Sequence, residues 1–399
     1  MPGKKYRRTG VTKRSANDRI PLFDLKLSQQ AMREVRDTLQ SGWLTTGPKV
    51  EKLEKAVADY LGVRYAVAVN SASAGLLLSL QAINVSAGQE VITTPFTFVA
   101  TIEAILHCGA TPVLADIVPD TLGVDPDEVA RKISKRTACI IPVDIAGHPA
   151  DYGTLCPMAS EHPIPLISDA SHAFGAAYKG RSIPRLADAA VYSFYSTKNL
   201  TCGEGGMVVS RFKPFVERIR LLSRHCMTSG AYQRQLGRKW EYDVAGLGFK
   251  ANLSDVQASI ALGELAGFDK NQAKRAAIAR RYSRNLANLS DYLHLPTVGA
   301  KTVHAWHLYV IRLHLSRLRI SRNKFIALMS DHGIECGVHY QPIFSLSFYR
   351  KLGYSGQHFP NSVYVGRRVV SLPMYPGLKP GEVDCICDVI HDIVKRHAR

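Results

Sequence analysis

The chain has 399 residues, of which 46% are hydrophobic and 21% are charged. These values are ordinary for a soluble globular protein, and the length suits two or three domain-sized units. No run approaches the roughly 18 consecutive apolar residues of a transmembrane helix, so we expect no integral membrane association. The N-terminus does not resemble a secretory signal, and the eight scattered cysteines form no CxxC pair. This pattern favours a cytoplasmic protein with free thiols and no bound metal.

The formal net charge is +18, and six basic residues lie within the first 14 positions. We interpret residues 1–20 as a basic, disordered tail. A basic surface can attract nucleic acid, an anionic membrane or a phosphorylated substrate. The chain has neither zinc-finger spacing nor the aromatic signature of RNA-binding modules, so we expect no nucleic-acid partner. The remaining positive charge suits an enzyme that handles a diphosphate.

From about Tyr65, short β-rich runs alternate with helical stretches, which predicts an α/β protein with a mostly parallel sheet. The predicted strands are 65–69, 90–93, 111–115, 137–143, 165–168, 189–194 and 206–210. The predicted helices are 72–83, 99–108, 126–133, 213–223 and a long helical pattern over 254–287. Strands at 306–315 and 335–340 and helices at 322–332 and 382–394 then predict a smaller α+β unit. We therefore expect a large domain at 21–288 and a small C-terminal domain at 289–399, packed tightly together.

Polar segments follow four of the predicted strands, at the edge where ligands gather in open α/β sheets. They are 70–75, 95–101, 169–172 and 193–206. The first, Asn70-Ser-Ala-Ser-Ala-Gly75, opens a helix whose free N–H groups and serine hydroxyls favour a phosphate. Serine is also an ordinary helix cap, so this segment alone leaves both interpretations open.

Two charged residues in these segments indicate chemistry. Asp169 ends an apolar strand, where a carboxylate is costly to bury without a cationic partner such as a protonated pyridine nitrogen. Capping of the next turn is the alternative role. Lys198 lies between a strand and a Gly-rich turn, and an amine in a partly dry pocket loses its proton more easily and becomes a nucleophile. His172 is placed either to contact a ring or to make a structural hydrogen bond.

From Pro21 to Ile393 the sequence resembles the DegT/DnrJ/EryC1/StrS sugar aminotransferases, which share the aspartate aminotransferase type I fold. The family's motifs appear in the family's order. They are Ser41–Pro48, Thr94–Thr101, Ile141–Asp151, Asp169, Lys198, Gly248–Ala258, Gly337–Pro342 and Ser371–Pro376. Ala251 departs from the pattern, because many members carry a larger residue there.

The resemblance implies pyridoxal 5'-phosphate as the cofactor and gives each matching residue a role. Ala72, Ser73 and Ser193 would hold the phosphate, with Asn252 reaching it from the other subunit of a homodimer with shared active sites. Phe98 would stack on the cofactor ring, Asp169 would pair with the pyridine nitrogen, and His172 would lie near the ring hydroxyl. Lys198 would be the Schiff-base lysine that shuttles the proton. The substrate-binding residues would be Thr45, Lys250, His339 and Tyr340.

The implied reaction transfers an amino group from L-glutamate to a keto group of a nucleotide-linked sugar, possibly C4 of a UDP-sugar. Two other classes use the same scaffold. Dehydratase relatives carry His in place of the lysine, and Lys198 argues against that reaction. A non-enzymatic regulator would have no need to retain Asp169, Lys198 and the glycines together. A nucleotide-binding enzyme without this cofactor would need a GxxxxGK[ST] or GxGxxG run, which the chain lacks.

Overall fold

The computed structural model describes residues 19–237 and 240–399. Residues 1–18 of the predicted tail therefore lie outside the described residues. Ile20 is fully buried and forms a parallel bridge with Ile334 in the C-terminal part of the chain. The folded body thus includes a residue that the sequence assigned to the tail. Within the described part of the chain, no helix has the length and apolar character needed to cross a membrane.

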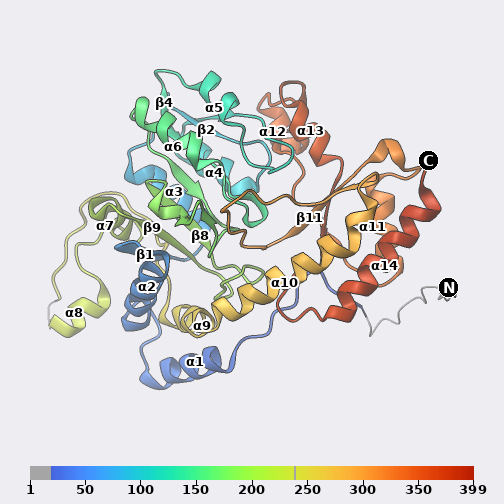
Figure 1. Cartoon of the computed structure of the whole chain (residues 1–399). Helices are drawn as coiled ribbons and strands as arrows, with labels where there is room; N and C mark the ends of the chain where they lie inside the picture. Colours follow the sequence, from blue (N-terminus) through green and yellow to red (C-terminus); the bar gives the residue numbers. More distant parts are fainter. Residues whose placement is uncertain (1–18, 238–239) are drawn as a thin grey trace.

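Seven strands form the sheet that carries the site; β1, β2, β4, β8 and β9 are labelled in Figure 1. Four of them hydrogen-bond in the order β1-β9-β8-β5 and three in the order β3-β2-β4. Parallel bridges from Ile140 to Leu166 and from Val143 to Asp169 join the two sets. The strands are β1 (Tyr65–Val69), β2 (Glu90–Thr93), β3 (Thr111–Leu114), β4 (Thr137–Ile140), β5 (Ile167–Asp169), β8 (Ala189–Ser193) and β9 (Gly206–Ser210). Only β9 runs against its neighbours among these seven, so the mostly parallel sheet is confirmed.

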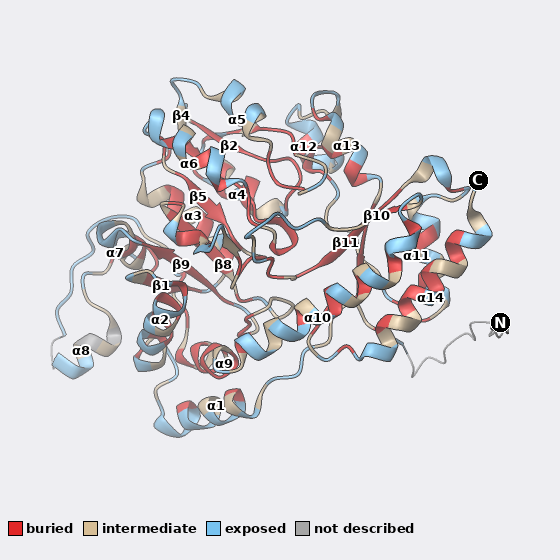
Figure 2. Ribbon diagram, viewed as in Figure 1, coloured by how far each residue is buried: buried red, intermediate tan, exposed pale blue. Residues whose placement is uncertain are grey.

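The sheet is buried on both faces, as its near-continuous apolar strands predict. In β1, Ala66 and Ala68 belong to one core cluster, whereas Val67 and Val69 belong to another. Figure 2 shows these strands as almost entirely buried. The helices of this part are α2 (Pro48–Leu61), α3 (Ala72–Ala82), α4 (Val99–His107), α5 (Pro126–Lys132), α6 (Tyr152–Glu161), α7 (Lys213–Leu222), α8 (Ala231–Gly237) and α9 (Asp255–Leu265). A short hairpin joins β6 (Ala177–Tyr178) to β7 (Arg181–Ser182).

The C-terminal part is built on an antiparallel sheet in the order β10-β11-β12, with its own core. Its strands are β10 (Leu293–His294), β11 (Tyr309–Leu313) and β12 (Val369–Leu372), and its helices are α11 (Arg322–Asp331), α12 (Ser347–Lys351), α13 (Pro360–Gly366) and α14 (Pro380–His397). The long helix α10 (Phe268–Leu286) runs from the large part to this one and packs beside α14 (Figure 1). The α+β character expected here is present, and the division at residue 288 stays a prediction.

Two predicted elements are wrong in detail. The helical pattern over 254–287 is interrupted at Ala266–Gly267, so it forms α9 and α10 rather than one helix. The segment 335–340 is not a regular strand, because its pairing is limited to a single bridge between Gly337 and Ser371. Two of its residues, His339 and Tyr340, line a cavity described below.

Helix α1 (Gln29–Ser41), which the sequence did not predict, packs closely against α9. A Cβ at Gly263 would overlap the backbone of Ala31, so the contact requires a glycine.

We expect Gly263→Ala to lower the free energy of unfolding by about 1–3 kcal/mol through overpacking. Gly381→Ala is the matched control, since Gly381 is also helical and a Cβ there meets nothing within 4 Å. Helix propensity then predicts a change of less than about 1 kcal/mol, in the stabilising direction. Denaturant unfolding of both variants checks this, and equal effects would contradict it.

Candidate active site

A cavity of about 590 Å³ lies where the parallel strands end. Its lining brings together nine of the twelve predicted site residues: Ala72, Ser73, Phe98, Asp169, His172, Ser193, Lys198, His339 and Tyr340. The other three, Thr45, Lys250 and Asn252, line a separate depression of about 210 Å³. The sequence therefore named nine of the residues that line one cavity, and it also named a second group that does not reach this cavity within the same chain.

Asp169 is the last residue of β5 and is only 5% exposed. Its Oδ2 accepts a hydrogen bond from Thr101 Oγ1 at 2.7 Å, and its Oδ1 accepts from Ser171 Oγ at 2.6 Å and from the Ser171 N–H at 3.2 Å. Thr101 in turn is 2.9 Å from Thr97 Oγ1. These donors fix the direction of the carboxylate, so it acts as a stable negative group within the cavity.

Lys198 follows β8 in a turn closed by a bond from its own N–H to the Tyr195 carbonyl at 2.9 Å. The side chain is half-buried and lines the cavity. Removal from water lowers the pKa of the Lys198 amine to about 8, and the negative charge of Asp169 opposes that shift. The amine therefore loses its proton more easily than an ordinary lysine, which favours a role as a nucleophile or a proton acceptor.

His172 is a neutral imidazole with an assigned orientation. Its Nδ1 accepts a hydrogen bond from the Ala146 N–H at 3.2 Å, so its proton lies on Nε2, which faces the Tyr340 hydroxyl at 3.1 Å. Burial is the main cause that holds the pKa of His172 well below its usual value, and a positive charge on Lys198 adds to it. Burial and Lys198 also lower the pKa of His339 to about 4, and its Nδ1 lies 2.9 Å from Ser371 Oγ.

The N-terminus of α3 forms a cradle for an anion. Ser71 is the N-cap and accepts from the Ala74 N–H, and the first turn of the helix carries no acidic residue. The N–H groups of Ala72 and Ser73 open this helix beside the cavity, where they favour a phosphate. A Cβ at Gly206 would lie 2.7 Å from the Ala72 nitrogen, so glycine is what lets β9 approach this turn.

Phe98 supplies the flat apolar surface that a ring needs. Its side chain is 55% exposed although it lines the cavity, and its ring centroid lies 6.0 Å from that of Tyr340. An exposed aromatic ring, an anion cradle, a fixed carboxylate and a lysine with a lowered pKa together fit pyridoxal phosphate. Each of its groups, the phosphate, the pyridine nitrogen, the ring face and the aldehyde, has a matching residue.

Sequence reasoning gave no role to several cavity residues. Thr101 and Ser171 are the donors that hold Asp169, and both lie inside segments that were singled out. The spacing of Thr97 and Thr101, four apart at the start of a helix, is the signal that indicates a shared side-chain cluster. His307 also lines the cavity, but it lay hidden at the start of the predicted strand 306–315.

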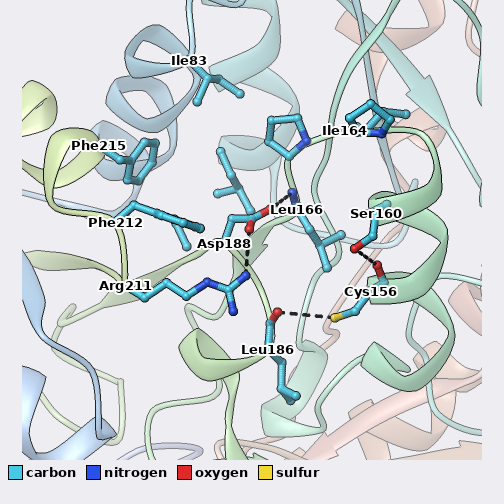
Figure 3. A pocket seen from close by; sticks show the side chains of 15 residues that line it. Ile83, Cys156, Ser160, Ile164, Leu166, Leu186, Asp188, Arg211, Phe212 and Phe215 are labelled. Atoms are coloured by element: carbon cyan, nitrogen blue, oxygen red, sulfur yellow. Dashed lines mark hydrogen bonds and ion pairs between the residues drawn. The ribbon is translucent and has the colours of Figure 1, made fainter.

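A further cavity of about 440 Å³ contains a different kind of surface (Figure 3). Its polar side chains bond to one another or to the backbone. Asp188 accepts from the Leu166 N–H at 2.9 Å and pairs with Arg211 at 3.2 Å, and the Ser160 hydroxyl donates to the Cys156 carbonyl. None of the predicted site residues lines this cavity.

The depression that holds Thr45, Lys250 and Asn252 is positively charged. The Lys250 amine donates to Asn252 Oδ1 at 2.6 Å, and the Asn252 amide donates to Thr46 Oγ1 at 2.5 Å. Its lining also includes Arg224, His225 and Arg234, against one acid, Glu51. This arrangement is suited to an anionic group.

Comparison with known proteins identifies the class. The model of the DegT/DnrJ/EryC1/StrS aminotransferase family matches residues 26–391. The spore coat polysaccharide biosynthesis protein SpsC of Bacillus subtilis is 38% identical over 372 residues, 92% of this chain and 95% of SpsC. The PLP-form of the putative sugar aminotransferase Spr1654 from Streptococcus pneumoniae has a TM-score of 0.89 at 31% identity, covering 95% of this chain and 99% of Spr1654. DesI, solved in the presence of its TDP-sugar product, has a TM-score of 0.86 at 27% identity, covering 96% and 95%.

The chain therefore belongs to the DegT/DnrJ/EryC1/StrS aminotransferase family. The expected aspartate aminotransferase type I fold is confirmed by these structural neighbours. The family and its PLP- and PMP-form neighbours show that the protein is an aminotransferase that depends on pyridoxal phosphate.

The effect of Asp169 on Lys198 gives a prediction for the ligand-free protein. The negative charge of Asp169 favours the ammonium form and raises the pKa of Lys198, so Asp169→Asn should move that pKa below about 8. Reductive methylation followed by mass spectrometry across pH should show Lys198 becoming reactive at lower pH in the variant. Labelling of the exposed Lys135 serves as the control and should be the same in both proteins. A Lys198 midpoint that stays in place or rises would contradict the assigned interaction.

Proposed function

We propose that this sugar aminotransferase transfers the amino group of L-glutamate to the keto group of a nucleotide-linked sugar, with C4 of a UDP-sugar as the specific position. The observation that carries the proposal is the desolvated Lys198 amine beside the fixed Asp169 carboxylate. DesI, at 27% identity, is described with its TDP-sugar product, which supports a nucleotide-linked substrate. The name of SpsC supports a role in polysaccharide biosynthesis.

The residues of the cavity divide the chemistry between them. Bound pyridoxal phosphate supplies an electron-withdrawing ring that stabilises negative charge on the substrate carbon. Asp169 holds the proton on the pyridine nitrogen, and His172 hydrogen-bonds near the ring hydroxyl. Lys198, once its amine is free, moves the proton at the substrate carbon. Phe98 covers the ring face and helps to exclude water.

The phosphate completes this set of contacts. The N–H groups of Ala72 and Ser73 and the hydroxyl of Ser193 bind its oxygens in our proposal. A dianionic phosphate in a partly dry site needs several charge-assisted hydrogen bonds. The positive helix end of α3 contributes to this, because the helix dipole favours negative charge at its N-terminus.

We further propose that the active unit is a homodimer with shared active sites. Thr45, Lys250 and Asn252 cluster in the basic depression, away from the cavity of their own chain. In a two-fold dimer each subunit offers the same surface to its partner, so such residues can complete the partner's site. Asn252 then reaches the cofactor phosphate, while Thr45 and Lys250 contact substrate together with His339 and Tyr340 of the other chain.

The same depression supports a diphosphate in the substrate. Arg224, Arg234 and Lys250 place three cations around about 210 Å³ of space. Arginine is well suited to bidentate contacts with phosphate oxygens.

A cytoplasmic location is also part of the proposal, supported by eight cysteines that are all free thiols.

A two-stage assay tests the reaction. Adding L-glutamate to the holoenzyme should shift the cofactor spectrum from the pyridoxal to the pyridoxamine form, and a UDP-linked 4-keto sugar should reverse it. Lys198→Ala should lose nearly all turnover while keeping the fold by circular dichroism. A response only to a different amino acid would overturn the choice of donor, and reversal only by other keto sugars would overturn the choice of sugar.

Mixed mutants test the shared site. Lys198→Ala and Asn252→Ala, each impaired alone, are combined under conditions where subunits exchange. One site in each mixed dimer then has its own Lys198 and its partner's Asn252, so activity should rise to a fraction of wild type. Lys135→Ala, at an exposed position that lines neither the cavity nor the depression, is the control and should keep wild-type activity alone and in the mixture. If the activity of the mixture does not recover although exchange is proven, or if the monomer is fully active, the shared-site proposal is wrong.

A further inference from the structure

His307 lines the Lys198 cavity, and the segment 304–307 that carries it is held by hydrogen bonds. The Ala305 carbonyl accepts hydrogen bonds from the side-chain amides of Asn199, at 2.6 Å, and Gln272, at 2.5 Å. Asn199 directly follows Lys198 in the chain, so the same turn that carries the lysine also fixes this segment. The segment is thus placed as a part of the site rather than as a loose connection to β11.

A buried arginine holds the segment from behind. Arg275 is 4% exposed, and its Nη1 donates to the carbonyls of Met374 at 3.0 Å and Trp306 at 3.4 Å. Burial lowers the pKa of Arg275 to about 10. Its positive charge is one of those that disfavour a proton on the neighbouring His307.

His307 is a neutral imidazole packed between other site residues. It is 3% exposed, its ring centroid lies 4.5 Å from that of His172, and it stacks on Phe23 at 6.0 Å. Burial is the main cause that holds the pKa of His307 well below its usual value, and a proton on the neighbouring His172 or Lys198 would lower it further. A neutral imidazole carries one N–H donor and one acceptor nitrogen.

The two ring nitrogens of His307 have different surroundings. Nδ1 is enclosed and has no hydrogen-bond partner among residues 19–237 and 240–399. A buried N–H without an acceptor is the costlier of the two unpaired groups, so we assign the proton to Nε2. Nε2 is then the hydrogen-bond donor of the ring, and the ring lines the cavity.

We propose that His307 positions the bound ligand by donating a hydrogen bond from Nε2 to a ligand oxygen beside Lys198. The oxygen belongs either to the cofactor ring or to the substrate, and both offer the same acceptor chemistry. This inference rests on the proposed function, because it takes the Lys198 cavity as the site where the cofactor and the substrates bind.

The alternative role for His307 is to fill space, and three variants separate the two. His307→Phe keeps the ring shape and removes the donor, whereas His307→Gln keeps an N–H near the position of Nε2. His162→Phe is the control, because His162 is exposed at the end of α6. The measurements are the melting temperature of the ligand-free protein, the dissociation constant for pyridoxal phosphate by absorbance titration, and the kinetic constants with L-glutamate.

For a positioning role we expect His307→Phe to melt at the same temperature as wild type or higher, since an unpaired buried group is replaced by an apolar ring. Ligand binding should nevertheless weaken by about 10-fold to 100-fold, the range for a lost hydrogen bond to a ligand. His307→Gln should recover part of that loss. A rise confined to the dissociation constant for pyridoxal phosphate assigns the oxygen to the cofactor. A rise confined to KM or a fall in kcat assigns it to the substrate.

Unchanged binding and kinetics in His307→Phe would overturn the proposal, as would a lower melting temperature with no rescue by His307→Gln. Nitrogen NMR of the wild-type protein adds an independent readout, since the Nε2 resonance should shift when pyridoxal phosphate or glutamate is added. If the wild-type protein binds pyridoxal phosphate but does not respond to glutamate, the proposed donor is wrong. The cofactor titration of His307→Phe still tests His307 in that case.

Discussion

A carboxylate taken out of water must find hydrogen-bond donors or a cation, because its ionised form loses most of its hydration. Asp169 meets this constraint at the end of β5 with donors from Thr101 and Ser171. Its remaining partner must come from within the cavity, where it favours the protonated form of Lys198 and fits a pyridinium nitrogen. The positions of β5, α4 and the turn after β8 around this one group explain why the cavity lies where it does.

The lysine is reactive because the same burial acts against its charge. Desolvation lowers the pKa of Lys198 to about 8, and the neutral His172 and His339 add no competing acid. The hydrogen bond from Asn199 to the Ala305 carbonyl joins the turn that carries Lys198 to the segment that carries His307. Function therefore depends on contacts between the sheet and the C-terminal part as much as on the sheet itself.

Much of this arrangement is predictable from sequence, and the reasons are local. Buried apolar runs identify each strand of the sheet, and the polar residues that follow them converge because parallel strands end at one edge. Tertiary contacts decided the rest. Helix α1 depends on its close fit to Gly263. The break at Ala266–Gly267 depends on the turn from α9 into α10. The segment 335–340 pairs through a single bridge. His307 was missed because a lone histidine at the start of a strand carries no pattern that separates a site residue from a packed one.

The central claim is that Lys198 binds pyridoxal phosphate covalently in this cavity. Reduction of the purified holoenzyme with borohydride should fix the cofactor permanently, and peptide mass spectrometry should then locate the pyridoxyl group on Lys198 alone. The absorbance of the holoenzyme near 400–430 nm should disappear in the same step. Modification of another lysine, or a protein that retains no cofactor when supplied with pyridoxal phosphate, would contradict the account.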